Sequence, residues 1–491
     1  MRGIGQVVGA VVGVWLAGCG ADPAKPGGPG GGHGPGDGGG SGGGGFTFGT
    51  KGPWDVANVT YGDAQGIREH PVVGLTTDEA QNRWIATESA LYLVKPGETA
   101  ARRYDAADGL HLQSNPARYC DNRELQPGEA CAGGSLSSGA AVDPGIRSVE
   151  GGRAGEVFVG YWGAHTDPLL CQAGQEWDDC DPLRHTGKID WVRLQPDGTL
   201  KVIRFNLATT GMGGKYWHDR TVNRMAFDHF VNRGTLYAAT EHGVDILFPD
   251  KWRAPLPGEW FDAQQKEYMG DHLHARVCFE VACAVREDSR MGDWMGLDVD
   301  AHGALWHAGK WTAGLITWDP DPANWHFRDG AAFAAAFGDP YYGPGGGGST
   351  PIFEVAKEGH EVHLSAVSVC PDGRVWFAST GVQDGLARDL GHAIAVWDGR
   401  TLTPYPPSAA GLAEAGVQDL ACLPDGRLAL AGARTGVVIW DPAKGTSAPV
   451  NAANGLLPSD DVQSLEVDRM ANPPTLHVAT GAGAAALRVL P

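Results

Sequence analysis

The sequence has few basic residues and, beyond its first residues, no long apolar stretch. Lys and Arg number 38 against 58 Asp and Glu, which gives a formal net charge of -20 at pH 7. Binding to nucleic acid or to an anionic membrane surface depends on clustered Lys and Arg, so neither is an expected partner. After residue 45, no segment supplies the roughly 20 consecutive apolar residues that a spanning helix needs.

Motifs of several enzyme classes are also missing. No glycine-rich loop follows a predicted strand and precedes a helix, as a nucleotide-binding loop would. The sequence contains no Gly-x-Ser-x-Gly elbow, and no set of Ser, His and acid can be singled out. It therefore gives no support to nucleotide-dependent chemistry or to serine hydrolysis.

The first 19 residues have the layout of an export signal. Arg2 precedes an apolar run from Val7 to Leu16, and Ala17-Gly18-Cys19 follows. This layout resembles the bacterial lipoprotein signal, in which the cysteine is lipidated and becomes the new N-terminus; the alternative is an ordinary cleaved signal. The resemblance implies lipidation of Cys19, and Gly20 after it favours the outer membrane of a Gram-negative cell. The lipid would be the chain's contact with the membrane.

Two further segments follow the signal. Residues 20–45 are mostly glycine and have no apolar residue larger than alanine, so we expect a flexible tether. Residues 46–491 exceed the size of about 250–300 residues at which a single core stops growing. Either several domains or a repeat architecture is therefore required.

A pair of period-two strands joined by a turn recurs seven times, which is typical of a β-hairpin repeat. The pairs begin at Val72, Ile146, Val222, Gly296, Val367, Leu420 and Val462. A third strand follows most pairs, as at 90–94 and 436–440, and a fourth is suggested at 101–104 and 201–205. Four short strands in each unit predict an all-β fold, a single β-propeller of about seven four-stranded blades. An orphan strand at 54–59 is expected to complete the last blade and so close the ring.

Two segments carry a family resemblance. Asn451-Ala-Ala-Asn-Gly-Leu-Leu-Pro-Ser-Asp-Asp-Val462, and Tyr104-Asp-Ala-Ala-Asp-Gly-Leu110 after Trp84-Ile-Ala-Thr87, resemble the repeats of two-component-regulator-type propellers. The resemblance implies the propeller fold for roughly residues 50–491. It implies no function, because the chain lacks a recognisable kinase or DNA-binding domain.

The long insertions all fall between blades or between second and third strands, so we expect them on one face of the propeller. They comprise residues 111–145, 163–188, 206–221, 250–294, 326–362 and 381–391. Loops on a rigid scaffold are where binding is commonly built, although long surface loops are also tolerated without a function.

Eight cysteines remain besides Cys19, an even number in a chain expected to be exported. Three pairs lie within single insertions and predict local disulfides: Cys120 with Cys131, Cys171 with Cys180, and Cys278 with Cys283. Metal binding is the alternative for these cysteines. Cys370 and Cys422 end inner strands of adjacent blades, and either a disulfide or two buried thiols fits them.

Histidines give the only sequence indication of a metal or acid–base site. His272 with His274, and His360 with His363, lie in two large insertions and could together hold a divalent ion, although solvated histidines are the simpler interpretation.

The first strand of each repeat is expected to lie innermost, beside the central channel. Most residues two positions after the start of this strand are small. The exceptions, Arg224 and Asp419, are predicted to lie across the channel from each other, as ligand contacts or as hydrated channel residues.

The leading functional hypothesis is a surface-tethered, non-catalytic module that binds an envelope protein, a peptide or a glycan with the face that carries the insertions. Aromatic residues in the insertions suit such recognition, unless they form small cores beneath the loops. The tentative binding residues are Arg224, Asp419, Trp217 and His218. One alternative is a metal-dependent propeller hydrolase or lyase with its site on the face with the insertions or in the central channel. The other is a structural component of an envelope complex.

Overall fold

The computed structural model separates the chain into two compact units, Met1–Gly42 and Gly43–Pro491. All described residues belong to the second unit. They are residues 47–50, 55–110, 112, 118–120, 123–124, 136–138, 145–162, 188–206, 221–240, 244–251, 272–273, 294–309, 312–317, 348–354, 364–380, 394–413 and 416–489. None of the helices in this part of the chain has the length and apolar character needed to cross a membrane.

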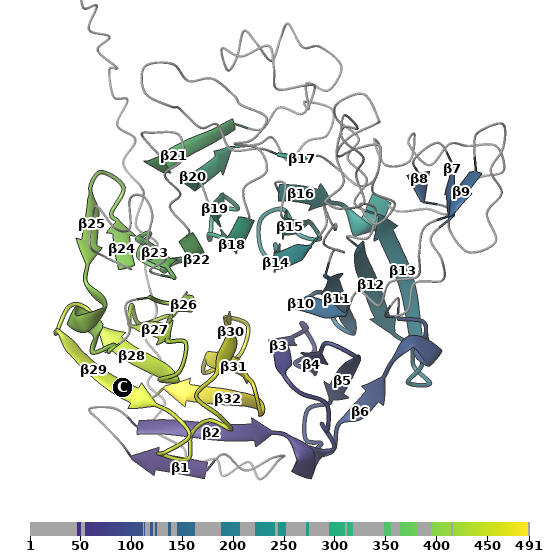
Figure 1. The fold of residues 1–491 in the computed structure, drawn as a ribbon, viewed down its shortest axis with the longest axis horizontal. Helices are drawn as coiled ribbons and strands as arrows, with labels where there is room; N and C mark the ends of the chain where they lie inside the picture. The colour runs from purple at the N-terminus through teal and green to yellow at the C-terminus, as the bar shows by residue number, and fades with distance from the viewer. Residues whose placement is uncertain are drawn as a thin grey trace, which may run out of the picture. The chain divides into compact units, whose positions relative to one another are not determined.

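Seven antiparallel sheets form the blades of the second unit, which confirms the predicted seven blades (Figure 1). The innermost strands are β3 (Val72–Thr77), β10 (Ile146–Gly151), β14 (Val222–Phe227), β18 (Trp294–Val299), β22 (Leu364–Val369), β26 (Asp419–Cys422) and β30 (Val462–Asp468). The second strands are β4 (Arg83–Thr87), β11 (Glu156–Tyr161), β15 (Leu236–Thr240), β19 (Leu305–Gly309), β23 (Val375–Ser379), β27 (Leu428–Ala431) and β31 (Thr475–Thr480).

The outer strands complete each blade. The third strands are β5 (Ala90–Val94), β12 (Lys188–Leu194), β16 (Val244–Leu247), β20 (Thr312–Thr317), β24 (Ile394–Trp397), β28 (Val437–Asp441) and β32 (Gly483–Val489). The fourth strands of blades one to six are β6 (Arg102–Tyr104), β13 (Leu200–Asn206), β17 (His272–Leu273), β21 (Gly348–Glu354), β25 (Leu402–Tyr405) and β29 (Thr446–Val450).

The N-terminal strand closes the ring, as the orphan strand predicts. β2 (Asp55–Tyr61) pairs with β32 in the last blade, with Val59 opposite Ala486, and β1 (Thr47–Thr50) adds a fifth strand outside it. The innermost strands contact one another in the order β3, β10, β14, β18, β22, β26 and β30, and β30 contacts β3 again. Joining the first and last units in one sheet pairs edges that would otherwise be open.

The hydrophobic core lies between blades, since successive residues of a strand face opposite sides of its sheet. Trp84 packs with Val149 and Val157 of the second blade, whereas the next residue, Ile85, packs with Ala486 of the last blade. Each blade therefore buries both faces. This two-sided burial explains why the second and third strands are almost continuously apolar.

A buried aspartate organises the turn after several inner strands. Asp78 accepts hydrogen bonds from the amides of Ala80 and Asn82, and its Oδ2 accepts from Trp84 Nε1 at 3.0 Å. Asp300 repeats the arrangement, with Trp306 Nε1 3.3 Å from its Oδ2. The Asp and Trp of the repeat motif are therefore structural residues of the blade.

Some strands lie in segments that the sequence analysis assigns to insertions. β17 and β21 are the fourth strands of the third and fourth blades, although both fall in predicted connections. A small separate sheet, β8-β7-β9, lies in the segment 111–145 and consists of Arg123–Glu124, Arg118–Cys120 and Leu136–Ser138. Because these strands are short or polar, period-two alternation does not reveal them.

Candidate functional site

A polar cavity of about 120 Å³ lies at the centre of the ring, at the last residues of the inner strands. Residues from all seven blades line it. Its charged and titratable lining residues are Glu150, Arg224, Asp228, His229, Asp298, Glu466, Asp468 and Arg469. The inner strands end at the short turns to the second strands. The cavity is therefore at the opposite end of the channel from the connections between blades.

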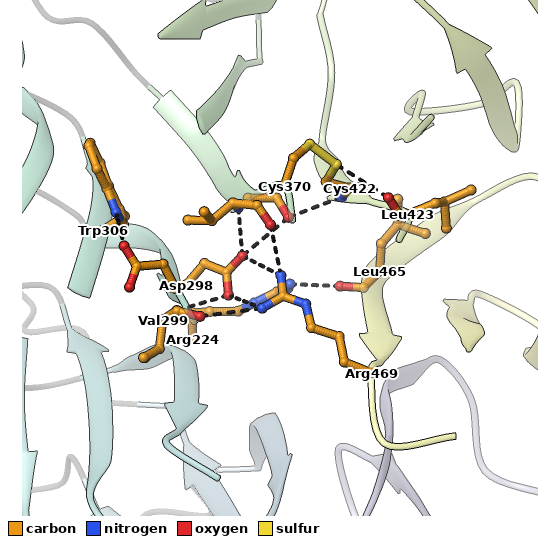
Figure 2. Close-up of polar contacts among 12 residues, drawn as sticks. Arg224, Asp298, Val299, Trp306, Cys370, Cys422, Leu423, Leu465 and Arg469 are labelled. Carbon is orange, nitrogen blue, oxygen red and sulfur yellow. Dashed lines mark hydrogen bonds and ion pairs between the residues drawn. A yellow bond between two sulfur atoms is a disulfide. The ribbon is translucent and has the colours of Figure 1, made fainter. Parts of the chain in front are cut away.

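Arg224 and Asp419, the two channel residues singled out from the sequence, contact each other across the ring. Figure 2 shows Arg224 with its other partner, Leu465. Arg224 Nη1 lies 2.9 Å from Asp419 Oδ2, and Arg224 Nη2 donates to the carbonyl of Leu465 at 2.6 Å. The same Asp419 Oδ2 accepts from the amide of Leu465 at 2.7 Å. These contacts join the third, sixth and seventh blades through one ion pair.

A second guanidinium spans the channel nearer to the turns. Arg469, just after β30, places its Nη2 2.7 Å from Asp298 Oδ2 and its Nη1 3.2 Å from Oδ1 (Figure 2). Its two terminal nitrogens also donate to the carbonyls of Val299 and Val369. Asp298 in turn accepts from the Val369 amide at 2.7 Å. The seventh blade is thus tied to the fourth and fifth.

Two glutamates line the cavity without an arginine hydrogen bond. Glu150 Oε1 accepts from the Phe227 amide at 3.0 Å, and Glu466 Oε1 accepts from the Thr76 hydroxyl at 2.7 Å. Thr76 Oγ1 also accepts from the amide of Gly151, where a Cβ would collide with the carbonyl of Thr77. The small residue after Glu150 thus allows the first and second blades to approach closely.

Burial raises the pKa of both glutamates. The pKa of Glu150 rises to about 8, chiefly through desolvation, while the Phe227 amide and Arg224 oppose the shift. Desolvation also raises the pKa of Glu466 well above its ordinary value, and the neighbouring charge of Glu150 adds to this. Two close carboxylates in a poorly solvated cavity retain protons more strongly than either would in water.

The rim of the cavity carries exposed apolar side chains. Phe230, Val231 and Met470 are 61%, 51% and 42% exposed, and among the described residues they are the only large hydrophobic side chains so exposed. All three lie in the first-to-second turns of the third and seventh blades, and Phe230 and Met470 line the cavity. We call these three residues the apolar rim.

Charged contacts hold the turn that carries Phe230. Arg233 Nη2 lies 3.1 Å from Glu79 Oε2, and His229 Nδ1 lies 3.4 Å from Glu79 Oε1. Glu79 belongs to the first blade, so the turn of the third blade reaches the turn of the first. Burial lowers the pKa of His229, which favours the neutral imidazole at this contact.

Cys370 and Cys422 form a disulfide (Figure 2). The sequence had left open whether these cysteines form a disulfide or remain two buried thiols. Their Cα atoms are 5.3 Å apart, and the cysteines are 3% and 1% exposed. The Cys422 amide donates to Ser368 Oγ, which lies 3.3 Å from Asp298 Oδ2. The bond therefore joins the fifth and sixth blades beside the cavity.

Most other predicted site residues lie outside the described part of the chain. These are Cys19, Cys131, Cys171, Cys180, Trp217, His218, His274, Cys278, Cys283, His360 and His363. Cys120 ends β7, and His272 begins β17. Within the described ranges, no group of three or more His, Cys, Asp or Glu residues could hold a metal ion. The predicted histidine site and the three local disulfides therefore remain predictions.

Sequence reasoning missed the charged residues closest to the turns. It considered only the third position of each inner strand, which contains Arg224 and Asp419. Two residues further along, the side chain faces the channel again, because strand side chains alternate with period two. That position holds Thr76, Glu150, Ala226, Asp298, Ser368, Ala421 and Glu466. The charged residues at this fifth position could therefore have been recognised from the sequence, two residues after the position that was considered.

No protein-family model matches the chain, and no curated protein matches it. Solved structures match at low identity. A streptogramin B lyase shares 9% identity over 88% of this chain and 98% of its own, with a TM-score of 0.46. The virginiamycin B lyase from Staphylococcus aureus shares 9% over 89% and 99%, with a TM-score of 0.43. YCF48 bound to the D1 peptide shares 11% over 89% and 96%, also with a TM-score of 0.43. The strand order of its seven blades makes this chain a β-propeller closed by its N-terminal strand.

Proposed function

We propose that the chain is a non-catalytic binding module that engages a protein or peptide segment at the mouth of the central cavity. The apolar rim carries this proposal. Scattered exposed hydrophobic residues need no explanation in a soluble protein. Here, however, every such residue in the described part of the chain lies in two turns at one cavity.

The composition of the rim and cavity suits polypeptide recognition. Interface centres are enriched in aromatic residues, Met and Arg, and Phe230, Met470 and Arg469 lie together here. The cavity beside them presents carboxylates and guanidinium groups that could fix the orientation of a bound segment. The ion pairs that tie opposite blades hold this surface on a preorganised scaffold, which reduces the entropy lost on binding.

We further propose that a lipid on Cys19 holds the module at the cell envelope, in the outer membrane. The lipoprotein-like residues Leu16-Ala17-Gly18-Cys19 and the glycine-rich segment 20–45 support this location. In cells fed a labelled fatty acid, the wild-type chain should take up label and sediment with membranes. A Cys19→Ser variant should do neither, and a variant that retains the label would refute lipidation at this residue.

A selection from a displayed peptide library on the purified chain tests the binding proposal. Selected peptides should bind at least about tenfold more weakly to Phe230→Ser, a loss equivalent to about 1.4 kcal/mol. The matched control is Arg400→Ser, which changes an exposed residue in the turn between β24 and β25 of the fifth blade. Peptides that bind Phe230→Ser and Met470→Ser as well as wild type would refute the rim as the binding surface.

The sequence-based alternative, a metal-dependent hydrolase or lyase, rests on His272, His274, His360 and His363. Metal content by mass spectrometry separates it from the binding proposal, with the protein purified without an affinity tag. The binding proposal predicts no stoichiometric divalent ion. A stoichiometric ion that is lost in a His272→Ala, His274→Ala variant would instead favour the enzyme.

A further inference from the structure

Glu150 and Glu466 each present one carboxylate oxygen to the cavity with no donor among the described residues. Glu150 uses Oε1 for the Phe227 amide, and Glu466 uses Oε1 for the Thr76 hydroxyl. Both side chains line the cavity, one from the second blade and one from the seventh. The two remaining oxygens therefore stand as open acceptors in a partly enclosed space.

The two arginines of the cavity do not neutralise this pair by direct contact. Arg224 is paired with Asp419, and Arg469 with Asp298. Their other contacts go to backbone carbonyls. Once each guanidinium has its aspartate, the two glutamates remain as surplus negative charge, which a proton or an incoming cation must compensate.

We propose that this glutamate pair binds the ammonium group of a lysine side chain presented by a polypeptide bound at the apolar rim. The inference deepens the proposed function and rests on it for the origin of the lysine. An ammonium is a compact charge with three donors, and it matches single acceptor oxygens on two separate side chains. A guanidinium is better matched by one bidentate carboxylate.

The size of the cavity and the character of the rim fit this ligand. An internal cavity of about 150 Å³ can hold benzene, so a volume of about 120 Å³ accommodates an alkylammonium of a few carbons. Phe230 and Met470 line the same cavity and can pack on the methylene stem of a lysine. The ammonium would thus reach the glutamates while the stem contacts the rim.

Proton release should accompany binding, since a pKa of about 8 leaves Glu150 mostly protonated near neutral pH, and burial shifts the pKa of Glu466 in the same direction. The other charged or titratable groups around them are Arg224, Asp228, His229, Asp298, Asp419, Asp468 and Arg469. The arginines keep their charge throughout the range considered. An ammonium should therefore bind more tightly at pH 8.5 than at pH 6.5, because fewer protons have to be displaced.

Calorimetric titration of the full chain with n-butylammonium chloride tests the inference, with n-butanol as the uncharged probe. Wild type should bind butylammonium, release protons, and bind butanol at least tenfold more weakly. Glu150→Gln and Glu466→Gln should each weaken butylammonium binding by about tenfold or more. The control Glu98→Gln changes an exposed glutamate between β5 and β6 of the first blade, outside the cavity lining, and it should bind as wild type does.

Equal binding of butanol and butylammonium, or unchanged butylammonium binding in both cavity variants, would overturn the inference. Cooperative urea unfolding of each variant confirms that it is folded. Failure of the broader proposal gives a different result: wild type would bind butylammonium, but no selected peptide would depend on Phe230. Another outcome is a selected peptide that depends on Phe230 and yet binds with unchanged affinity when its own lysine is replaced by glutamine. That result would support the binding module and contradict the lysine site.

Discussion

Arg224 and Asp419 come from blades on opposite sides of the ring and meet in the channel, with 2.9 Å between Nη1 and Oδ2. Asp419 is also the hydrogen-bond acceptor of the Leu420 and Leu465 amides. One aspartate thus fixes the inner strands of the sixth and seventh blades and orients an arginine from the third.

This pair should stabilise the closed ring. Arg224→Met leaves Asp419 without its counter-charge and the Leu465 carbonyl without its donor, which we expect to cost on the order of 2 kcal/mol of unfolding free energy. Asp419→Asn should cost a similar amount. In urea unfolding, the double variant should lose clearly less than the sum of the two single losses. Strictly additive losses would show that the two residues do not interact in solution.

The cavity glutamates should make stability depend on pH. The pKa of folded Glu150 is about 8 against an ordinary value of 4.5, so the folded chain keeps a proton that the unfolded chain releases. Stability from this group is complete below pH 4.5 and is lost as pH rises towards 8. Between pH 6.5 and 8, Glu150→Gln should therefore show a smaller fall in urea midpoint than wild type. An identical slope in wild type and Glu150→Gln would contradict the raised pKa.

Buried histidines should act in the opposite direction at lower pH. Burial lowers the pKa of His307 to about 3 and that of His477 to about 4. As pH falls through 6.5, these histidines therefore take up protons in the unfolded chain but not in the folded chain. The free energy of unfolding decreases as a result. At pH 6.5 half of these histidines are still protonated in the unfolded chain, so the effect extends to about pH 7.5. It is the same in wild type and in Glu150→Gln, so the difference between their two slopes isolates the glutamate effect.

The disulfide between Cys370 and Cys422 should contribute about 2–4 kcal/mol to stability, the usual range for a natural cross-link. We expect a Cys370→Ala, Cys422→Ala variant to unfold at lower urea concentration than wild type under non-reducing conditions. Peptide mapping without reductant should recover the 370–422 cross-link from wild type. It should also recover the predicted pairs at 120–131, 171–180 and 278–283. Recovery of peptide 370 with a free thiol would show that the bond is absent.

Asp78 should matter for folding and not for binding. It is 1% exposed and accepts from two turn amides, the Asn82 side chain, Trp84 Nε1 and the Gly155 amide. Asp78→Ala leaves these buried donors unpaired and should cost about 3 kcal/mol in urea unfolding. The folded fraction should still bind selected peptides with wild-type affinity. A stable Asp78→Ala chain would contradict the structural role given to the repeat aspartate.

The fold was predictable because each blade repeats one local pattern. Period-two alternation at Val72–Thr77 and Val462–Asp468, with turn formers between strands, identifies the hairpins without knowledge of long-range contacts. The closing strand was expected at 54–59 from a count of the strands in the last blade, and the structure has it at Asp55–Tyr61. Strands such as β17, with two residues, and β21, which contains Pro351, carry too little alternation to be recognised.

The site was predictable only in part. Arg224 and Asp419 were identified because they are large where other blades have small residues, but the sequence could not show that they pair. Glu150, Asp298 and Glu466 lie one period further along and were not considered. The apolar rim could not be foreseen, since an exposed Phe230 and a buried Phe227 have the same local sequence character.

Hydrogen exchange with and without a saturating selected peptide tests the central claim, recognition at the cavity mouth, most directly. Binding at the apolar rim predicts slower exchange in the turns at 228–235 and 468–474, with no change in the outer turn at 398–401. Slower exchange confined to the predicted insertions, such as 163–188 or 326–362, with the two rim turns unchanged, would contradict it.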